Sequence, residues 1–272
     1  MPSTDLFLAL SLILLACVLP ASLLTLLARR AGWGNSAVRR TVWTGAVTAF
    51  VLLIGQAAVV IWAEVGASRA SVDQAALDWF VANRDGWATG FAIVLAAIGG
   101  TAALTVLTCA AVLVLVYFGH WQRALLVAGA SAGSGLLVIG FKNLYDRNRP
   151  PRVDQLIHYG GYSLPSGHAL GSIVVFGVLA AAALPVLRRT AQVWVVAGAA
   201  ALVLLVGWCR VYLGAHWVTD VLTGWLLGGA WLTFAVTALA LMSMAPDPNV
   251  PAESDPPAGS HRSGADTAEA SR

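Results

Sequence analysis

The chain has 272 residues, of which 58% are hydrophobic and only 11% are charged. Soluble domains carry roughly 25% charged residues, so this composition excludes an ordinary soluble domain and indicates an integral membrane protein. The formal net charge of +3 is too small to suggest a nucleic-acid partner. The three cysteines fit no metal motif. We therefore expect small packing residues and no disulfide framework. No cofactor is expected.

Seven apolar stretches alternate with polar connectors along the chain. Each is long enough to cross a bilayer, which takes about 20 residues per helix. The sequence therefore predicts an all-α, polytopic membrane bundle with about seven spans. We place these spans at Leu6–Ala28, Thr41–Ala63, Phe91–Phe118, Ala124–Phe141, Ala169–Leu187, Ala191–Trp208 and Val218–Met242.

Two further patterns refine this picture. The connector Glu64–Gly90 contains Leu77, Trp79 and Phe80, which predict a short interfacial helix. Glycines four residues apart favour close helix packing in membranes, and they occur at Gly129 and Gly133 and again at Gly224 and Gly228.

The arginines orient the spans. Arg29, Arg30, Arg39 and Arg40 lie in one connector, and Arg188 and Arg189 lie in another. Because short cytoplasmic loops are rich in Lys and Arg, we assign both connectors to the cytoplasm and the N-terminus to the outside. Five basic residues then fall on the outer side, against this rule: Lys142, Arg147, Arg149, Arg152 and Arg210. Their position indicates an anionic partner.

The segment RVYLGAHWVTD places Arg210, His216 and Asp220 at the mouth of a span. Ionisable residues are costly there and usually functional. His216 and Asp220 are four residues apart, so they share one helix face. The carboxylate can accept the Nδ1–H of the imidazole and leave Nε2 as a nucleophile. The alternative is an anchoring arginine beside a His–Asp hydrogen bond that only secures a helix end.

The segment KNLYDRNRP contains Lys142, the only lysine in the chain, and Arg149. If the preceding helix continues, these two residues lie two turns apart on one face until Pro150 ends the helix. Lys and Arg together suit a phosphate group. For Arg147 and Arg152 we expect instead that the side chains reach for lipid headgroups.

The segment PSGH, Pro165 to His168, directly precedes a span. Pro165 and Ser166 are ordinary residues for a helix start. Gly167 leaves backbone N–H groups open to an anion, and His168 stands beside them, where it can give or take a proton.

These three segments, in this order and spacing, resemble the signature of the type 2 phosphatidic acid phosphatase family. The resemblance implies that His216 attacks phosphorus, Asp220 orients His216, and His168 protonates the leaving oxygen. It also implies that Lys142, Arg149, Ser166, Gly167 and Arg210 hold the phosphate, without a metal. Cys209 departs from the pattern, because the family usually has a serine before this arginine.

The resemblance also implies a division of the chain. Residues 41–242 form a six-helix phosphatase core, residues 1–40 an extra N-terminal helix and cytoplasmic loop, and residues 243–272 a disordered cytoplasmic tail. We expect a multi-pass plasma-membrane enzyme with an extracytoplasmic site.

We expect the substrate to be a lipid phosphate, with an undecaprenyl-type diphosphate ranked before phosphatidic acid, phosphatidylglycerophosphate and diacylglycerol diphosphate. A phosphotransferase of the same family and a non-enzymatic anion transporter remain alternatives. The sequence leaves the oligomeric state open.

Overall fold

A computed structural model of the chain describes residues 21–65 and 69–245. These residues form helices joined by short turns, with one long connector at residues 146–166. Residues 21–30 are helical and precede the first labelled helix. The labelled helices are α2 (Ser36–Val65), α3 (Arg69–Ala82), α4 (Gly86–Ile98), α5 (Thr101–Tyr117), α6 (Trp121–Tyr145), α7 (Gly167–Ala183), α8 (Arg189–Tyr212) and α9 (Val218–Met244), with short 3-10 turns at Arg152–Asp154 and Leu184–Val186.

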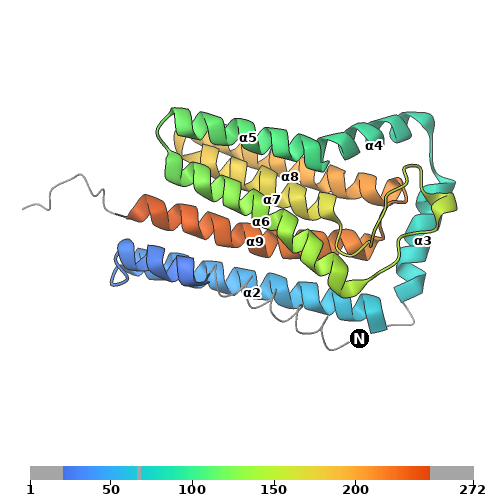
Figure 1. Cartoon of the computed structure of the whole chain (residues 1–272), viewed down its shortest axis with the longest axis horizontal. Helices are drawn as coiled ribbons and strands as arrows, with labels where there is room; N and C mark the ends of the chain where they lie inside the picture. Colours follow the sequence, from blue (N-terminus) through green and yellow to red (C-terminus); the bar gives the residue numbers. More distant parts are fainter. Residues whose placement is uncertain (1–20, 66–68, 246–272) are drawn as a thin grey trace, which may run out of the picture.

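Helices α7 and α9 form the centre of the bundle. Helix α9 packs mainly against α2 and α7, while α7 also contacts α8, α6 and α5. Figure 1 shows α2 on one flank and α4 and α5 on the other, with α3 lying across one end. We call this the α3 end. The core between α6, α7 and α9 is built from small and branched apolar side chains, among them Val127, Leu170, Val174, Val178 and Leu227.

The all-α membrane fold predicted from the sequence is confirmed. Among the described residues, five helices are long and apolar enough to span a membrane, and the number is six when a bent pair of helices is taken as one span. These six correspond to the predicted core. Most of the first predicted span, Leu6–Ala28, lies outside the described residues, and so does nearly all of the predicted tail.

The prediction of one continuous span at Phe91–Phe118 was wrong. Helix α4 ends at Ile98, α5 begins at Thr101, and the two axes are bent by 46°. The break falls at Gly99 and Gly100. A Cβ added at Gly99 would lie 2.5 Å from the Val206 side chain, so glycine allows α8 to approach the bend. Apolar composition predicts that a segment is buried in lipid but does not show where two glycines interrupt it.

The connector Glu64–Gly90 contains α3, a helix of 14 residues. The predicted helix is therefore confirmed. It does more than lie on the surface, because one of its faces packs against other helices. Asp73 and Leu77, one turn apart, are both buried, whereas Trp79 is exposed. The buried face of α3 thus covers the ends of α8 and α9, which it contacts.

The glycine pairs have different environments. Gly224 and Gly228 on α9 face the start of α7, where added Cβ atoms would lie 2.8 Å from the Ser166 carbonyl oxygen and 3.0 Å from the Leu170 carbonyl oxygen. Close packing at this pair is therefore confirmed. Gly133 faces Trp231 of α9, but Gly129 has open space around it, so the prediction fails for Gly129.

Replacing Gly224 with alanine should lower the stability of the bundle by about 1–3 kcal/mol, because the new methyl group must push α7 away from α9. The measurement is thermal unfolding of the purified protein in detergent. Gly198→Ala on α8 is the matched control, since no atom lies within 4 Å of a Cβ there. Equal melting temperatures for the two variants would contradict close packing of α7 on Gly224.

Candidate functional site

The three polar segments of the sequence meet at the α3 end. The end of α8 carries Arg210, the start of α7 carries Ser166, and the start of α9 carries Asp220. The Ser166 N–H donates to the Asp220 carbonyl oxygen at 3.0 Å, which joins the α7 and α9 segments directly. Lys142 and Arg149 come from the end of α6 and the connector that follows it (Figure 1).

A Schellman turn brings His216 back toward Arg210. Gly214 adopts a φ of +67°, its N–H donates to the Val211 carbonyl, and the Ala215 N–H donates to the Arg210 carbonyl. This is the pairing that closes a helix on a left-handed glycine. The His216 N–H also donates to the Arg210 carbonyl, at 3.2 Å. The spacing between Arg210 and His216 is therefore set by the geometry of the helix end.

Two different partners select the same tautomer of His216. Nδ1 lies 3.4 Å from Oδ2 of Asp220, and Nε2 lies 3.2 Å from Nη1 of Arg149. An ionised carboxylate only accepts hydrogen bonds and a guanidinium only donates them. Nδ1 therefore carries the proton, and the Nε2 lone pair points to the cationic side of the site. The relation of His216 to Asp220 expected from the sequence is present.

His216 is 2% exposed, and its surroundings favour the neutral imidazole. Burial lowers the pKa of His216 well below its ordinary value of 6.5, and the charges of Arg210, Arg149 and Lys142 lower it further. The Arg149 guanidinium is affected in the same way, because burial and then the charge of Arg210 lower its pKa. The site is therefore a place where positive charge is crowded and an anion would be stabilised.

Lys142, Arg149 and Arg210 bond to main-chain and phenolic oxygens. Lys142 Nζ donates to the Tyr162 carbonyl at 2.6 Å, and Arg149 donates to the carbonyls of Gly160, Gly161 and Ala215. Within the described part of the chain, none of these three cations forms a salt bridge with a carboxylate. The arrangement leaves their positive charge available to an anionic ligand.

Arg210 is fully buried, and its guanidinium carbon lies 4.3 Å from the centre of the Tyr159 ring. Its Nη1 donates to the Tyr159 hydroxyl at 3.0 Å, while its Nε finds no acceptor among the described residues. The same ring lies 5.7 Å from the Arg149 guanidinium and 6.1 Å from the His168 ring. Tyr159 thus brings both arginines and the second histidine around one point. The sequence analysis missed this residue, because a tyrosine in a loop carries no motif signal.

Helix α7 starts as the PSGH segment predicts. Ser166 is its N-cap, Gly167 its first residue, and the Ser166 hydroxyl oxygen accepts from the Ala169 N–H at 3.4 Å. The Ser166 N–H is not open to an anion, because it donates to Asp220. That part of the predicted amide site was wrong, and Gly167 is the first open position. His168, half-buried in the first turn, is close enough to His216 and Arg210 for their charges to interact.

Two predictions about the segment KNLYDRNRP were wrong. Helix α6 ends at Tyr145, and Asp146 takes the left-handed conformation with φ 46°, so Arg149 lies in a loop and not on a helical face with Lys142. Arg147 does not reach for headgroups. It is 8% exposed and pairs with Asp73 at 2.7 Å and with Asp220 at 2.6 Å. Exposed Arg152 agrees with its expected position at the surface.

Cys209, which stands where the resemblance places a serine, faces the core. Its Sγ lies 3.0 Å from the Val206 carbonyl oxygen on its own helix, and it packs with Ala92, Leu95 and Tyr212. The thiol therefore contributes to the contact between α8 and α4.

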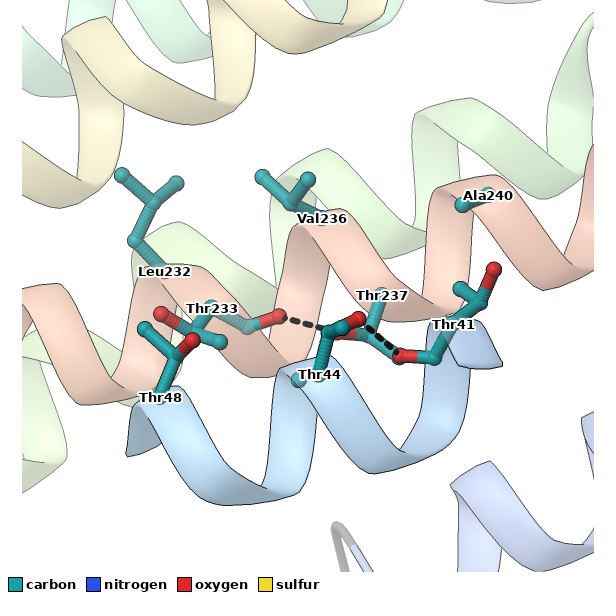
Figure 2. Close-up of a pocket in the computed structure, with 9 residues that line it drawn as sticks. Thr41, Thr44, Thr48, Leu232, Thr233, Val236, Thr237 and Ala240 are labelled. Carbon is teal, nitrogen blue, oxygen red and sulfur yellow. Dashed lines mark hydrogen bonds between the residues drawn. The ribbon is translucent and has the colours of Figure 1, made fainter. Parts of the chain in front are cut away.

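A groove of about 340 Å³ lies far from this site, between α2 and α9 (Figure 2). It is lined by Thr41, Thr44, Gly45, Thr48, Leu232, Thr233, Val236, Thr237 and Ala240. The hydroxyls of Thr44, Thr233 and Thr237 donate to carbonyls of their own helices. None of the predicted site residues borders it. Thr233 lies thirteen positions after Asp220 on α9, about 20 Å along the helix, so the groove belongs to the other half of the bundle.

The fold and the site define a multi-pass α-helical membrane protein with a cationic site that contains two histidines. Residues 123–241 match the family model of the PAP2 superfamily. This match covers all three polar segments of the site.

The chain is similar to phosphatidylglycerophosphatase B of Bacillus subtilis (strain 168), with 42% identity over 91 residues, which are 32% of this chain and 43% of that protein. It is also similar to an undecaprenyl-diphosphatase of Sulfolobus acidocaldarius, with 42% identity over 73 residues, or 27% of this chain and 31% of that protein. Less than half of either relative is thus spanned.

A solved structure extends the comparison to the whole fold. The crystal structure of a transmembrane PAP2 type phosphatidylglycerolphosphate phosphatase from Bacillus subtilis superposes with a TM-score of 0.63 and 25% sequence identity. The superposition covers 72% of this chain and 96% of that one.

If Nε2 of His216 is the nucleophile, the pH dependence of turnover should reflect the protonation state of this histidine. Neutral imidazole predominates above its pKa, and this pKa lies well below 6.5. We therefore expect no loss of kcat/KM as the pH falls through 6.5 and an acid limb only at more acidic pH, provided the protein stays folded. The measurement is the pH profile of the purified protein. An acid limb at or above pH 6.5 would contradict a neutral, buried His216.

Cys209→Ser should change kcat/KM by less than about threefold, or ~0.7 kcal/mol, because the side chain bonds to its own helix. The measurement is steady-state turnover, with Cys109→Ser on the exposed surface of α5 as the matched control. A large gain in turnover for Cys209→Ser alone would show that position 209 contacts the reacting group.

Proposed function

We propose that this protein is a lipid phosphate phosphatase that acts through a phosphohistidine on His216. The observation that carries the proposal is the orientation of His216. Its Nδ1 faces the Asp220 carboxylate, and its Nε2 lone pair faces a group of three cations with no carboxylate partner among the described residues. A phosphate held by those cations would lie in front of a neutral nucleophile.

In the proposed first step, Nε2 of His216 attacks phosphorus while the bond from phosphorus to the lipid oxygen breaks. The electron pair of that bond stays on the oxygen, which takes a proton from His168. Asp220 stabilises the imidazolium that forms on His216. Lys142, Arg149, Arg210 and the N–H of Gly167 bind the phosphate oxygens as their charge shifts in the transition state.

In the second step, a water molecule attacks the phosphorus of phosphohistidine. His168 takes the proton from that water, the bond between Nε2 and phosphorus breaks, and its electron pair returns to Nε2. Phosphate leaves, and both histidines have regained their starting states. These two proposed steps use no metal ion and no cofactor, so we propose a metal-independent enzyme.

The substrate class follows from the position of the site. Helices α2, α6 and α8 begin at the end opposite to α3, close to Arg39, Arg40, Arg123 and Arg189. By the positive-inside rule that end faces the cytoplasm, and the α3 end faces outward at headgroup depth. We therefore propose a lipid phosphate in the outer leaflet of the plasma membrane. An undecaprenyl-type diphosphate and phosphatidylglycerophosphate are the leading candidates, since similar proteins carry these two activities in their names.

The test is phosphate release from a panel of lipid phosphates in detergent, with a chelator present throughout. The wild type should release phosphate without any acceptor lipid, which separates hydrolysis from phosphotransfer. His216→Ala should reduce the rate by at least about 10⁴-fold, as expected for removal of a covalent nucleophile. His158→Ala, in the exposed part of the connector, is the matched control and should keep its activity.

A second measurement follows the covalent intermediate. With a ³²P-labelled substrate, label should appear on histidine in the wild type and be absent in His216→Ala. Retention of activity by His216→Ala would refute the proposed mechanism. Complete loss of wild-type activity in the presence of the chelator would refute it as well.

A further inference from the structure

A buried ion network lies behind the proposed nucleophile. Arg147 donates from Nη1 to Oδ1 of Asp220 at 2.6 Å and from Nη2 to Oδ2 of Asp73 at 2.7 Å. Thr219 completes the network, since its hydroxyl accepts from Arg147 at 2.6 Å and donates to Asp73 at 2.7 Å. The Thr219 N–H donates to the other oxygen of Asp73 at 3.1 Å.

Each group in this network has its hydrogen-bonding geometry fixed from several directions. Asp73 is 3% exposed, Asp220 is fully buried and Arg147 is 8% exposed. The second oxygen of Asp220 accepts from the Trp217 N–H at 2.9 Å and faces Nδ1 of His216. Asp220 therefore has one oxygen for Arg147 and one for the start of α9 and the histidine. Arg147 and the Trp217 N–H together determine how the carboxylate is turned.

The charges of the network suggest what Asp73 contributes. Arg147 alone would neutralise Asp220 and leave no net negative charge behind His216. With Asp73, the two carboxylates and one guanidinium carry a net charge of −1. In a buried environment this charge is weakly screened, and it favours the imidazolium that forms when His216 bonds to phosphorus.

The geometry points to Asp73 and Arg147 as positioning residues that hold Asp220 ionised and correctly turned behind His216, and so control the rate of phosphoryl transfer without touching the substrate. This inference rests on the proposed function. Asp73 comes from α3, which precedes the part of the chain that matches the superfamily model, residues 123–241. The connector helix is thereby part of the reaction centre.

The principal variant is Asp73→Asn. It keeps the size of the side chain and an oxygen for the Thr219 N–H, but it removes one negative charge. Removing Arg147 would leave two buried carboxylates without a cation and threaten the fold, so the second variant is Arg147→Lys, which keeps the charge but not the two-pronged geometry. Asp78→Asn, on the exposed face of α3, is the matched control.

Two readouts separate positioning from simple loss of structure. For Asp73→Asn we expect kcat to fall by about tenfold or more, as is typical when an outer partner of a reacting group is removed. KM should stay within about twofold, because the substrate contacts are untouched. If Asp73 acts through Arg147, its effect on kcat should shrink in the Arg147→Lys background.

The second readout is the ¹⁵N NMR spectrum of histidine-labelled protein, assigned with His216→Gln. It reports the tautomer of His216 whether or not any lipid is hydrolysed. The charged groups that face this ring are Asp220, Arg149, Arg210, Lys142 and His168. None of them is altered in Asp73→Asn, so we assign any change in the tautomer to the network. We expect a larger share of the Nε2–H form in Asp73→Asn than in the wild type, and no change in this share in Asp78→Asn.

The outcomes are distinct. A wild type that releases no phosphate would refute the proposed function, while a tautomer shift in Asp73→Asn would still support the network. A wild-type tautomer and wild-type kcat in Asp73→Asn would overturn the inference, and so would a loss of activity that follows only the unfolded fraction.

Discussion

The organising constraint of this structure is electrostatic repulsion among three cations. Lys142, Arg149 and Arg210 are brought together at one end of an apolar bundle, where burial and then the charge of Arg210 lower the pKa of Arg149. No carboxylate among the described residues neutralises them directly. Their hydrogen bonds go to carbonyl oxygens and to a tyrosine hydroxyl, which are dipoles and not charges. Much of the surrounding structure serves to hold this unfavourable arrangement in place.

The nearby acidic residues show how this arrangement is kept open. Asp73 and Asp220 lie at the same end of the bundle, yet both are bound to Arg147. Arg147 thus occupies the two carboxylates that could otherwise pair with two of the other three cations. One region can then contain both a strong buried ion network and a site with unsatisfied positive charge. His216 lies between the two, with one ring nitrogen toward each.

Sequence reasoning was most successful where a contact depends on local geometry. His216 and Asp220 are one helical turn apart, and the spacing between Arg210 and His216 follows from a glycine turn at a helix end. Such relations are encoded by residues near each other in the chain. The apolar spans were predictable for the same reason, since a helix in lipid must satisfy its own backbone.

The features that the sequence did not predict depend on contacts between residues that are far apart in the chain. The pairing of Arg147 with Asp73 joins residues 74 positions apart, and the contact of Tyr159 with Arg210 joins residues 51 apart. Neither has a periodic signal, and Arg147 in isolation suits a membrane surface equally well. The bend at Gly99 depends on the approach of α8, which the sequence of α4 and α5 does not reveal. These features depend on how the helices pack.

One consequence concerns how freely the connector can diverge. The oxygens of Gly160, Gly161 and Tyr162 that receive Lys142 and Arg149 are peptide carbonyls, and every amino acid has one. Substitutions at Gly160 and Tyr162 would change the side chains and leave these acceptors in the backbone, whereas Gly161, with a φ of +72°, favours glycine. The connector can therefore change its side chains at these two positions and still hold Lys142 and Arg149 through its backbone.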